Sequence, residues 1–332
     1  MADIAITTEL QEIQNNLWGT NVRENIALAL EKLQNLPEEP NTIQGSLKNS
    51  KLSLLKVSIQ NMENTLQSRK DQLDRIKARL EQVSGRTILQ YGQCGDDVYY
   101  AICDDGEAAL YGTGATYDYT FHDSVFYQNG QIKKIVLSNG ITGLGDRLFY
   151  HCANAETVSL PATLTSIGDS AFAQEDAAIG YPAGLTSVTI PQAVTAIQSY
   201  AFYHPAIAEV TVPASVKTWG KYAFSGCAKL KTARVACDSI GAFAFTRCTS
   251  LSSLTISANC RTFGENMLTY CESLTAITYE GTIAQWNAIT KPVNWMSSGE
   301  HSYNNYLKKI QCVDGYLEYD PENNVWNEVK NG

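Results

Sequence analysis

The chain has 332 residues, 44% of them hydrophobic, and a formal net charge of −9 at pH 7. No apolar run approaches the 18 residues of a membrane span, so we expect no membrane partner. The acidic balance also argues against a nucleic-acid partner, because such binding needs clustered Lys and Arg. The N-terminal sequence MADIAITTELQEIQ contains acids and no apolar core, so we expect no secretory signal.

Residues 3–36 predict two amphipathic helices separated by Gly19. Asn21 and Glu24 form a capping box at the start of the second helix. The pair is too short to be a stable domain alone, so we expect residues 1–36 to be a docking segment. The expected docking residues are Leu10, Ile13, Leu17, Trp18, Val22 and Ile26.

A G-x-x-V-R-x-x-I phrase lies within residues 10–33, formed by Gly19, Val22, Arg23 and Ile26. This stretch resembles the N-terminal segment of baseplate and tail proteins from tailed phages of Gram-positive bacteria. The resemblance implies that the segment attaches the chain to a tail particle. The alternative is an ordinary helical hairpin.

A linker with two prolines, LPEEPN at 36–41, precedes a heptad pattern over residues 42–83. Nine of the ten core positions are apolar and Arg69 is the tenth, which predicts a parallel coiled coil within residues 37–85. The expected oligomerisation residues are Leu52, Leu55, Ile59, Met62, Leu66, Leu73, Ile76, Leu80 and Val83. β-branched residues at the second core position disfavour a dimer, and the phage resemblance favours a homotrimer; a tetramer stays open.

From Thr87 onward, short β-rich phrases alternate with turn signals such as QCGDD. A stack of repeats must shield its open ends. We therefore expect residues 86–131 to form an N-terminal cap and residues 292–332 to form a C-terminal cap.

Residues 132–291 repeat one phrase, whose closing aromatic recurs every 21 to 30 residues. Such a period predicts a solenoid. Each unit contains an L-x-x-V-x-I pattern that places apolar side chains on one face of a short strand. The closing positions are Phe149, Phe172, Phe202, Phe224 and Phe245, with Leu268 in the same slot.

Four of the nine cysteines lie three residues after this closing position: Cys152, Cys227, Cys248 and Cys271. Their place in the repeat favours small buried thiols that stack along the core over a disulfide framework. The odd total agrees with reduced thiols. The sequence contains no C-x-x-C pair, so we expect no zinc site.

The full phrase, L-x-x-V/I-x-I-P-x-x-V-x-x-I-x-x-x-A-F-x-x-C, resembles the BspA-like leucine-rich repeat family of bacterial surface proteins. The resemblance extends from Gly106 to Tyr319, although Glu175 and Pro205 replace the usual Cys. It implies a leucine-rich-repeat β-solenoid. The fold class expected for the whole chain is mixed α and β, with N-terminal helices and a parallel coiled coil followed by this solenoid.

The sequence offers no catalytic constellation. It contains no phosphate-binding loop, no H-E-x-x-H and no G-x-S-x-G motif, and its four histidines are scattered. The pairs Asp96-Asp97 and Asp104-Asp105 favour turns over a calcium site. We therefore expect no catalytic residues, no metal and no cofactor, and a protein that is not an enzyme.

The interval from Phe172 to Phe202 is the longest, so residues 173–184 predict a loop that leaves the stack. Aromatic residues near this loop suggest a binding surface. The candidate receptor-binding residues are Tyr181, Tyr200, Tyr203, His204, Trp219, Tyr222, Glu175 and Asp176. The alternatives are a tolerated insertion and aromatic rings that pack under neighbouring coils.

Together these features predict a phage tail or baseplate receptor-binding protein, located in the virion. Its helices would dock on tail proteins, and its repeats would bind a host cell-surface glycan or protein. The alternative is a BspA-like surface adhesin without a phage connection. A cell-wall hydrolase is less favoured, because the acids show no paired grouping beyond the turns.

Overall fold

The computed structural model describes residues 85–174, 184–296 and 306–331, except 321 and 324, together with short runs and single residues between 53 and 78. The chain divides into two compact units, Met1–Arg75 and Ile76–Gly332. The described residues between 53 and 78 are helical, and side-chain bonds such as Gln67 Nε2 to Asp71 Oδ1, at 2.8 Å, follow the helical i, i+4 spacing.

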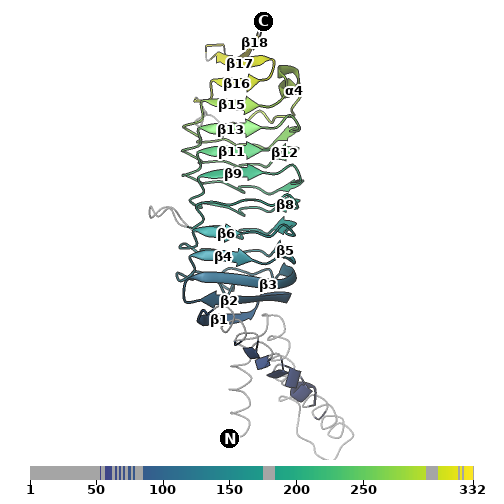
Figure 1. Cartoon of the computed structure of the whole chain (residues 1–332). Helices are drawn as coiled ribbons and strands as arrows, with labels where there is room; N and C mark the ends of the chain where they lie inside the picture. Colours follow the sequence, from purple (N-terminus) through teal and green to yellow (C-terminus); the bar gives the residue numbers. More distant parts are fainter. Residues whose placement is uncertain are drawn as a thin grey trace, which may run out of the picture. The chain divides into compact units, whose positions relative to one another are not determined.

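The second unit is a β-solenoid, in which successive coils stack two rows of short parallel strands (Figure 1). Its first strands are antiparallel and close one end of the stack: β1 (Ile88–Gln93), β2 (Gly95–Cys103) and β3 (Glu107–Thr116). β3 is long enough to begin both rows, because its first half pairs with β4 and its second half pairs with β5.

The first row contains the longer strands, and it pairs in register from coil to coil. A single bridge, Thr157 to Ser187, continues it in the coil that forms no full strand there. Its strands are β4 (Lys134–Leu137), β6 (Thr157–Ser159), β9 (Glu209–Val212), β11 (Thr232–Val235), β13 (Ser253–Ile256), β15 (Ala276–Tyr279) and β16 (Lys309–Cys312).

The second row consists of shorter strands, most with two residues. They are β5 (Ile141–Leu144), β7 (Ser166–Ile167), β8 (Ala196–Ile197), β10 (Thr218–Trp219), β12 (Ser239–Ile240) and β14 (Thr262–Phe263). In the last coil the helix α4 (Ile283–Asn287) follows β15, begun by a capping box between Thr282 and Gln285. The antiparallel strands β17 (Gly315–Asp320) and β18 (Val325–Lys330) close the sheet.

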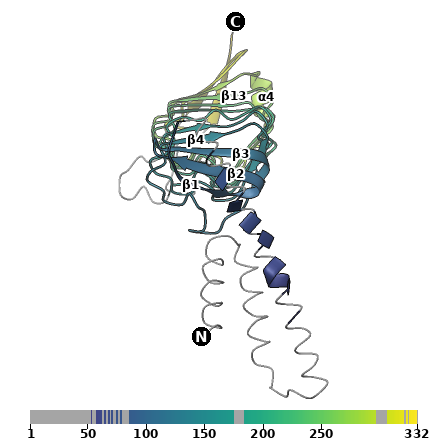
Figure 2. The same ribbon diagram turned by 60° about the horizontal axis from the view of Figure 1, so that its bottom comes forward.

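The alternation of buried and exposed side chains along each strand explains where the core lies. In β9, Val210 and Val212 are buried while Glu209 and Thr211 are exposed, as expected for a strand with one face in the core. No coil can bury its apolar face alone, so stacking joins these faces into one continuous core. Figure 2 shows the stack from its β1 end, with the first-row strands aligned behind one another.

The predicted fold class, mixed α and β with N-terminal helices and a parallel coiled coil, is wrong. From residue 85 onward the regular secondary structure is almost entirely β, and among the described residues every buried hydrophobic residue lies at or after Ile88. Fold class follows from where apolar surface is buried, and here that is the β-stack. Of the heptad core positions only Ile59 is described, and it is half-buried; the other predicted seam residues and residues 1–36 lie outside the described residues.

Candidate functional site

A stack of phenylalanine rings runs through the solenoid core, and it organises the surface beside it. Adjacent rings from Phe149 to Phe245 lie 5.0 to 5.9 Å apart and within 18° of parallel. Phe126 extends the stack by one coil, 4.8 Å from Phe149. Phe126 was not predicted as a repeat ring, because its phrase lacks both the preceding Ala and the following Cys.

Each phenylalanine lies in a closing turn, the segment that connects the second-row strand to the next coil. Alternate backbone N–H groups of this turn donate to carbonyls of the following coil, as from Tyr200 to Lys221 (2.9 Å), Phe202 to Ala223 (2.8 Å) and His204 to Ser225 (2.9 Å). The residue two before the ring has a left-handed backbone in successive coils, with φ of 56° at Tyr200 and 60° at Tyr222. Non-glycine residues rarely adopt this geometry, and the hydrogen bonds between coils hold it in place.

The four repeat cysteines also belong to the closing turns. Each thiol donates to the carbonyl of the phenylalanine one coil earlier, at 3.0 Å from Cys152 to Phe126 and 3.2 Å from Cys248 to Phe224. Burial raises the pKa of Cys152 to about 12. All nine cysteines of the chain are buried and free, so these thiols are packing groups with little thiolate character.

A partly exposed aromatic ladder lies outside the phenylalanine stack. It consists of Tyr200, Tyr222 and Phe243, each two residues before one of three consecutive stacked phenylalanines, and Tyr222 and Phe243 are half-buried. Tyr222 lies 5.0 Å from Tyr200 and 4.4 Å from Phe243, with the rings within 13° of parallel. Tyr203 meets Tyr200 edge to face at 5.3 Å, and His204 lies 4.0 Å from Tyr203. Tyr200 remains 37% exposed.

The structure therefore brings together four of the predicted receptor-binding residues: Tyr200, Tyr203, His204 and Tyr222. Trp219 lies apart from them, half-buried and 6.0 Å from both Phe224 and Phe245, where it packs against the core. Tyr181, Glu175 and Asp176 lie outside the described residues, as do the predicted docking residues. Phe243, which was not among the candidate receptor-binding residues, completes the ladder. It lies two residues before Phe245, the same repeat position as Tyr200 and Tyr222, and this position is the signal that could have identified it.

A second aromatic cluster lies on earlier closing turns. Tyr127 and Tyr150 stack at 5.9 Å, His122 lies 4.6 Å from Tyr127, and Phe121 lies 5.8 Å from Tyr150. Phe121 is 57% exposed, and the Arg147 guanidinium lies 4.6 Å from its ring centroid. Tyr150 directly follows the repeat ring Phe149, whereas Phe121 and Tyr127 precede the first recognisable repeat.

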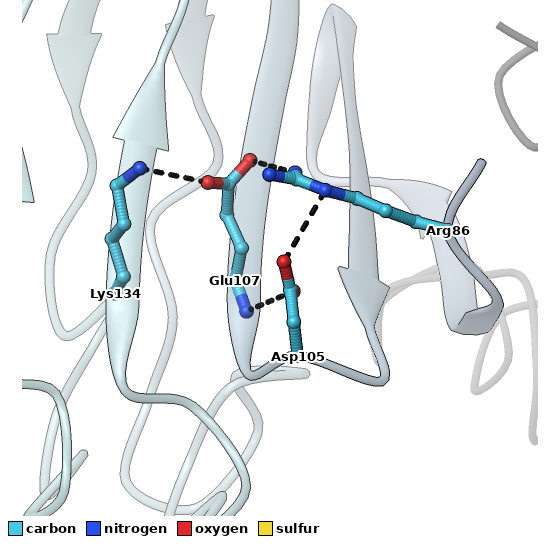
Figure 3. Close-up of polar contacts among 4 residues, drawn as sticks. All are labelled: Arg86, Asp105, Glu107 and Lys134. Carbon is cyan, nitrogen blue, oxygen red and sulfur yellow. Dashed lines mark hydrogen bonds and ion pairs between the residues drawn. The ribbon is translucent and has the colours of Figure 1, made fainter. Parts of the chain in front are cut away.

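The outward side of the first strand row carries a polar ladder at its N-terminal end (Figure 3). Glu107 accepts from Arg86 at 2.7 Å and from Lys134 at 2.9 Å, and Arg86 also contacts Asp105 at 3.2 Å. Burial alone would raise the pKa of Glu107, but the hydrogen bonds from Lys134 and Arg86 outweigh it and hold this pKa below its usual value. Both oxygens of the Glu107 carboxylate are paired. The cluster therefore joins β3 to β4 and to the segment before β1 that contains Arg86, and it offers no free acid or base.

The described part of the chain shows little sign of a metal site or a membrane-spanning helix. There, no three His, Cys, Asp or Glu side chains lie close enough to hold a metal ion. Within the same residues, no helix has both the length and the apolar character needed to cross a membrane. The partly exposed aromatic ladder is thus the most distinctive group of side chains that the repeats position.

Comparisons with known proteins agree with the repeat architecture. The sequence matches the family model for the BspA type leucine rich repeat region, with six copies over residues 119–179 and 176–290. These ranges run from residue 119 to residue 290, which is 172 of the 332 residues. No curated protein matches the sequence.

Solved structures of similar sequence are also leucine-rich repeat proteins. One from Eubacterium ventriosum is 18% identical over 67% of this chain and 93% of its own, with a TM-score of 0.33. Another from Bacteroides ovatus is 19% identical over 65% and 70%, with a TM-score of 0.36, and the T. pallidum leucine rich repeat protein is 21% identical over 56% and 87%, with a TM-score of 0.37. Such weak likenesses add no argument to the family match. Because that match covers more than half of the sequence, the chain belongs to the BspA-type leucine-rich repeat family.

Proposed function

We propose that this protein is a BspA-like surface adhesin, a non-enzymatic binding protein that contacts a macromolecule at a cell surface. Its contact surface is the aromatic ladder, Tyr200, Tyr222 and Phe243, with Tyr203 and His204 beside it. Aromatic side chains supply much of the energy at protein interfaces. A solenoid suits this role, because it presents side chains at fixed intervals on a rigid stack.

One observation carries the proposal. The slot two before the repeat ring holds buried Ser170 and Asn266 in the flanking coils but three stacked aromatic residues between them. Ser and Asn therefore satisfy the backbone geometry of this slot, with φ of 54° and 53°. The backbone geometry at this position therefore does not require an aromatic ring, which leaves binding as the role that we propose for these three.

The matched test exchanges the ladder for the residues that the same slot holds elsewhere. The variant Tyr200→Ser, Tyr222→Ser, Phe243→Asn should keep the β-sheet circular dichroism of the native protein. Its attachment to a panel of immobilised bacterial cells, epithelial cells and mucin should fall at least about tenfold, the loss of roughly one strong interface contact. Leu89→Ser, which removes an exposed side chain from β1, is the control and should attach normally. Full attachment by the folded triple variant would refute the proposal.

The phage-tail function stays a prediction with less support. Residues 1–36, which carried it, lie outside the described residues and outside the family match. The virion location, the tail-protein partner and the homotrimer are likewise untested. Light scattering that gives the mass of one chain in solution would contradict the homotrimer.

A further inference from the structure

Charge is unevenly distributed along this acidic chain, and the exception coincides with the aromatic ladder. Residues 203–250 carry six basic residues against Glu209 and Asp238, a net charge of +4. Since the whole chain carries −9, all other residues together carry −13. The six basic residues are Lys217, Lys221, Lys229, Lys231, Arg234 and Arg247.

Two of these six are neutralised within the fold. Lys217 pairs with Asp238 at 2.7 Å, and Arg234 binds both carboxylate oxygens of Glu280 at 2.8 and 2.9 Å. The other four are exposed, and among the described residues none of them forms an ion pair. Their charges are available to a partner.

Two of the available cations lie in the closing turns of the ladder itself. Lys221 directly precedes Tyr222, and its carbonyl accepts the N–H of Tyr200 at 2.9 Å. Arg247 lies two residues after Phe245, with its guanidinium 5.9 Å from the exposed ring of Tyr270. Exposed positive charge and partly exposed aromatic rings therefore belong to the same coils.

The orientation of the rings selects among anionic partners. Within the ladder the ring faces cover one another, because their centroids lie 4.4 to 5.0 Å apart and their planes are nearly parallel. A sugar ring binds an aromatic residue by stacking on its open face, and both faces of Tyr222 are occupied. The exposed edges carry partial positive charge and favour carboxylates and side-chain contacts instead.

We propose that the aromatic ladder, together with Lys221 and Arg247, binds an acidic segment of a protein partner in which carboxylates alternate with apolar side chains. The carboxylates would pair with the two cations, and the apolar side chains would pack against the ring edges. This inference rests on the proposed adhesin function and names the chemistry of its partner. Opposite charge across an interface accelerates association and gives selectivity.

The test uses the full chain and three probes matched in carboxylate or amine concentration. They are a fluorescent peptide of alternating Glu and Leu, its Lys and Leu counterpart, and polygalacturonate, an anionic polysaccharide. We expect the acidic peptide to bind, with affinity falling as salt rises, and the basic peptide not to bind. Lys221→Gln with Arg247→Gln should weaken the acidic peptide about tenfold, a magnitude typical of two exposed charge pairs.

Lys133→Gln with Lys308→Gln removes two exposed cations from other coils and should leave peptide affinity unchanged. Equal weakening by this control, or tighter binding of polygalacturonate than of the acidic peptide, would overturn the inference. A third outcome would overturn the acidic partner but leave the adhesin function intact. In that outcome, attachment to the surface does not depend on salt, the ladder variant loses it, and the variant with Lys221→Gln and Arg247→Gln keeps it. Normal attachment by the ladder variant would refute the adhesin function itself.

Discussion

Gly226 shows how tightly a closing turn constrains a single residue. Its φ is 73°, and a Cβ at this position would lie 2.0 Å from Cδ2 of His204 in the preceding coil. Gly226→Ala combines left-handed strain with overpacking, so we expect a loss of about 2–4 kcal/mol in the free energy of unfolding, measured in urea. Gly130→Ala is the control, because its Cβ would lie 3.6 Å from the nearest side-chain atom, and it should be nearly neutral.

The buried thiols make the stability of the fold sensitive to alkaline pH. Burial raises the pKa of Cys152 and Cys237 to about 12 in the folded chain, whereas an unfolded thiol titrates near pH ~8.5. The folded state therefore keeps protons that the unfolded state loses. The contribution of these thiols to the free energy of unfolding should be constant below about pH 8 and should fall as the pH rises toward 12.

Urea unfolding between pH 7 and 10.5 measures this slope. Cys152→Ala should unfold more easily at pH 7, by about 1–2 kcal/mol, because it loses the bond to the Phe126 carbonyl and some packing. Its slope above pH 8.5 should be shallower than that of the native chain. Val216→Ala, a core deletion without a titrating group, should lower stability and keep the native slope; an unchanged slope in Cys152→Ala would contradict the explanation.

Some residue positions followed from the sequence and others did not. The ring and thiol slots repeat at fixed offsets, so their common environment was predictable. The left-handed backbone at Tyr200, Tyr222 and Phe243 was not, because these residue types have no preference for positive φ. Hydrogen bonds between coils impose that backbone, and they exist only once the coils are stacked.

At the scale of elements, the phenylalanine stack determines how coils join. Phe224 contacts Phe202 at 5.0 Å, Phe245 at 5.9 Å and Trp219 at 6.0 Å. Phe224→Ala should cost about 3–5 kcal/mol in urea unfolding, because it leaves a cavity between three rings. Phe224→Leu should cost about 1–1.5 kcal/mol, since Leu268 fills the same slot in a later coil. Equal losses for the two variants would show that the stack is not the joining element.

The polar ladder on β3 and β4 predicts a response to acid. The pKa of Glu107 is lowered in the folded chain, so its contribution to stability is present above the unfolded pKa of ~4.3 and is lost as the pH falls through the lower folded value. Glu107→Gln should therefore be less stable than the native chain at pH 7, and the difference should shrink below pH 4. Exposed Glu209→Gln is the control. A difference for Glu107→Gln that does not change with pH would refute the assignment.

The two rows of strands were predictable to different degrees. Alternation such as Leu254-Thr255-Ile256 predicts the first-row strands, because side-chain direction has a period of two. The second-row strands have only two residues in most coils, as at Ser166–Ile167, which is too short for any periodic signal. These short strands are defined by their parallel pairing with the equivalent strand of the neighbouring coil, which the sequence of one coil does not show.

At the scale of the molecule, the predicted fold class was wrong because the heptad pattern and the repeats differ in what they need to bury their apolar faces. A heptad pattern shows which face of a helix is apolar, but only a partner surface can bury it. The repeats need no such partner, since each coil covers the next. The main apolar core of the described residues therefore extends from Cys94 to Leu317, and Ile88 belongs to a small separate cluster with Ala101 and Cys103.

The last coil of a repeat stack has no following coil to cover its apolar side chains, and here the C-terminal strands cover them. Leu307, Ile310, Cys312 and Leu317 are buried over the last coil, whereas the residues of β18 are largely exposed. Removing residues 321–332 should leave a soluble chain whose melting temperature falls by only about 2–4 °C, because little buried apolar surface is lost. Removing residues 308–332 uncovers the apolar side of β15 and α4, where Ile277, Tyr279 and Trp286 lie. That variant should bind a hydrophobic dye and aggregate, since an exposed apolar patch of this kind promotes association. A soluble, monodisperse 308–332 deletion with native dye binding would show that these strands are not the cap.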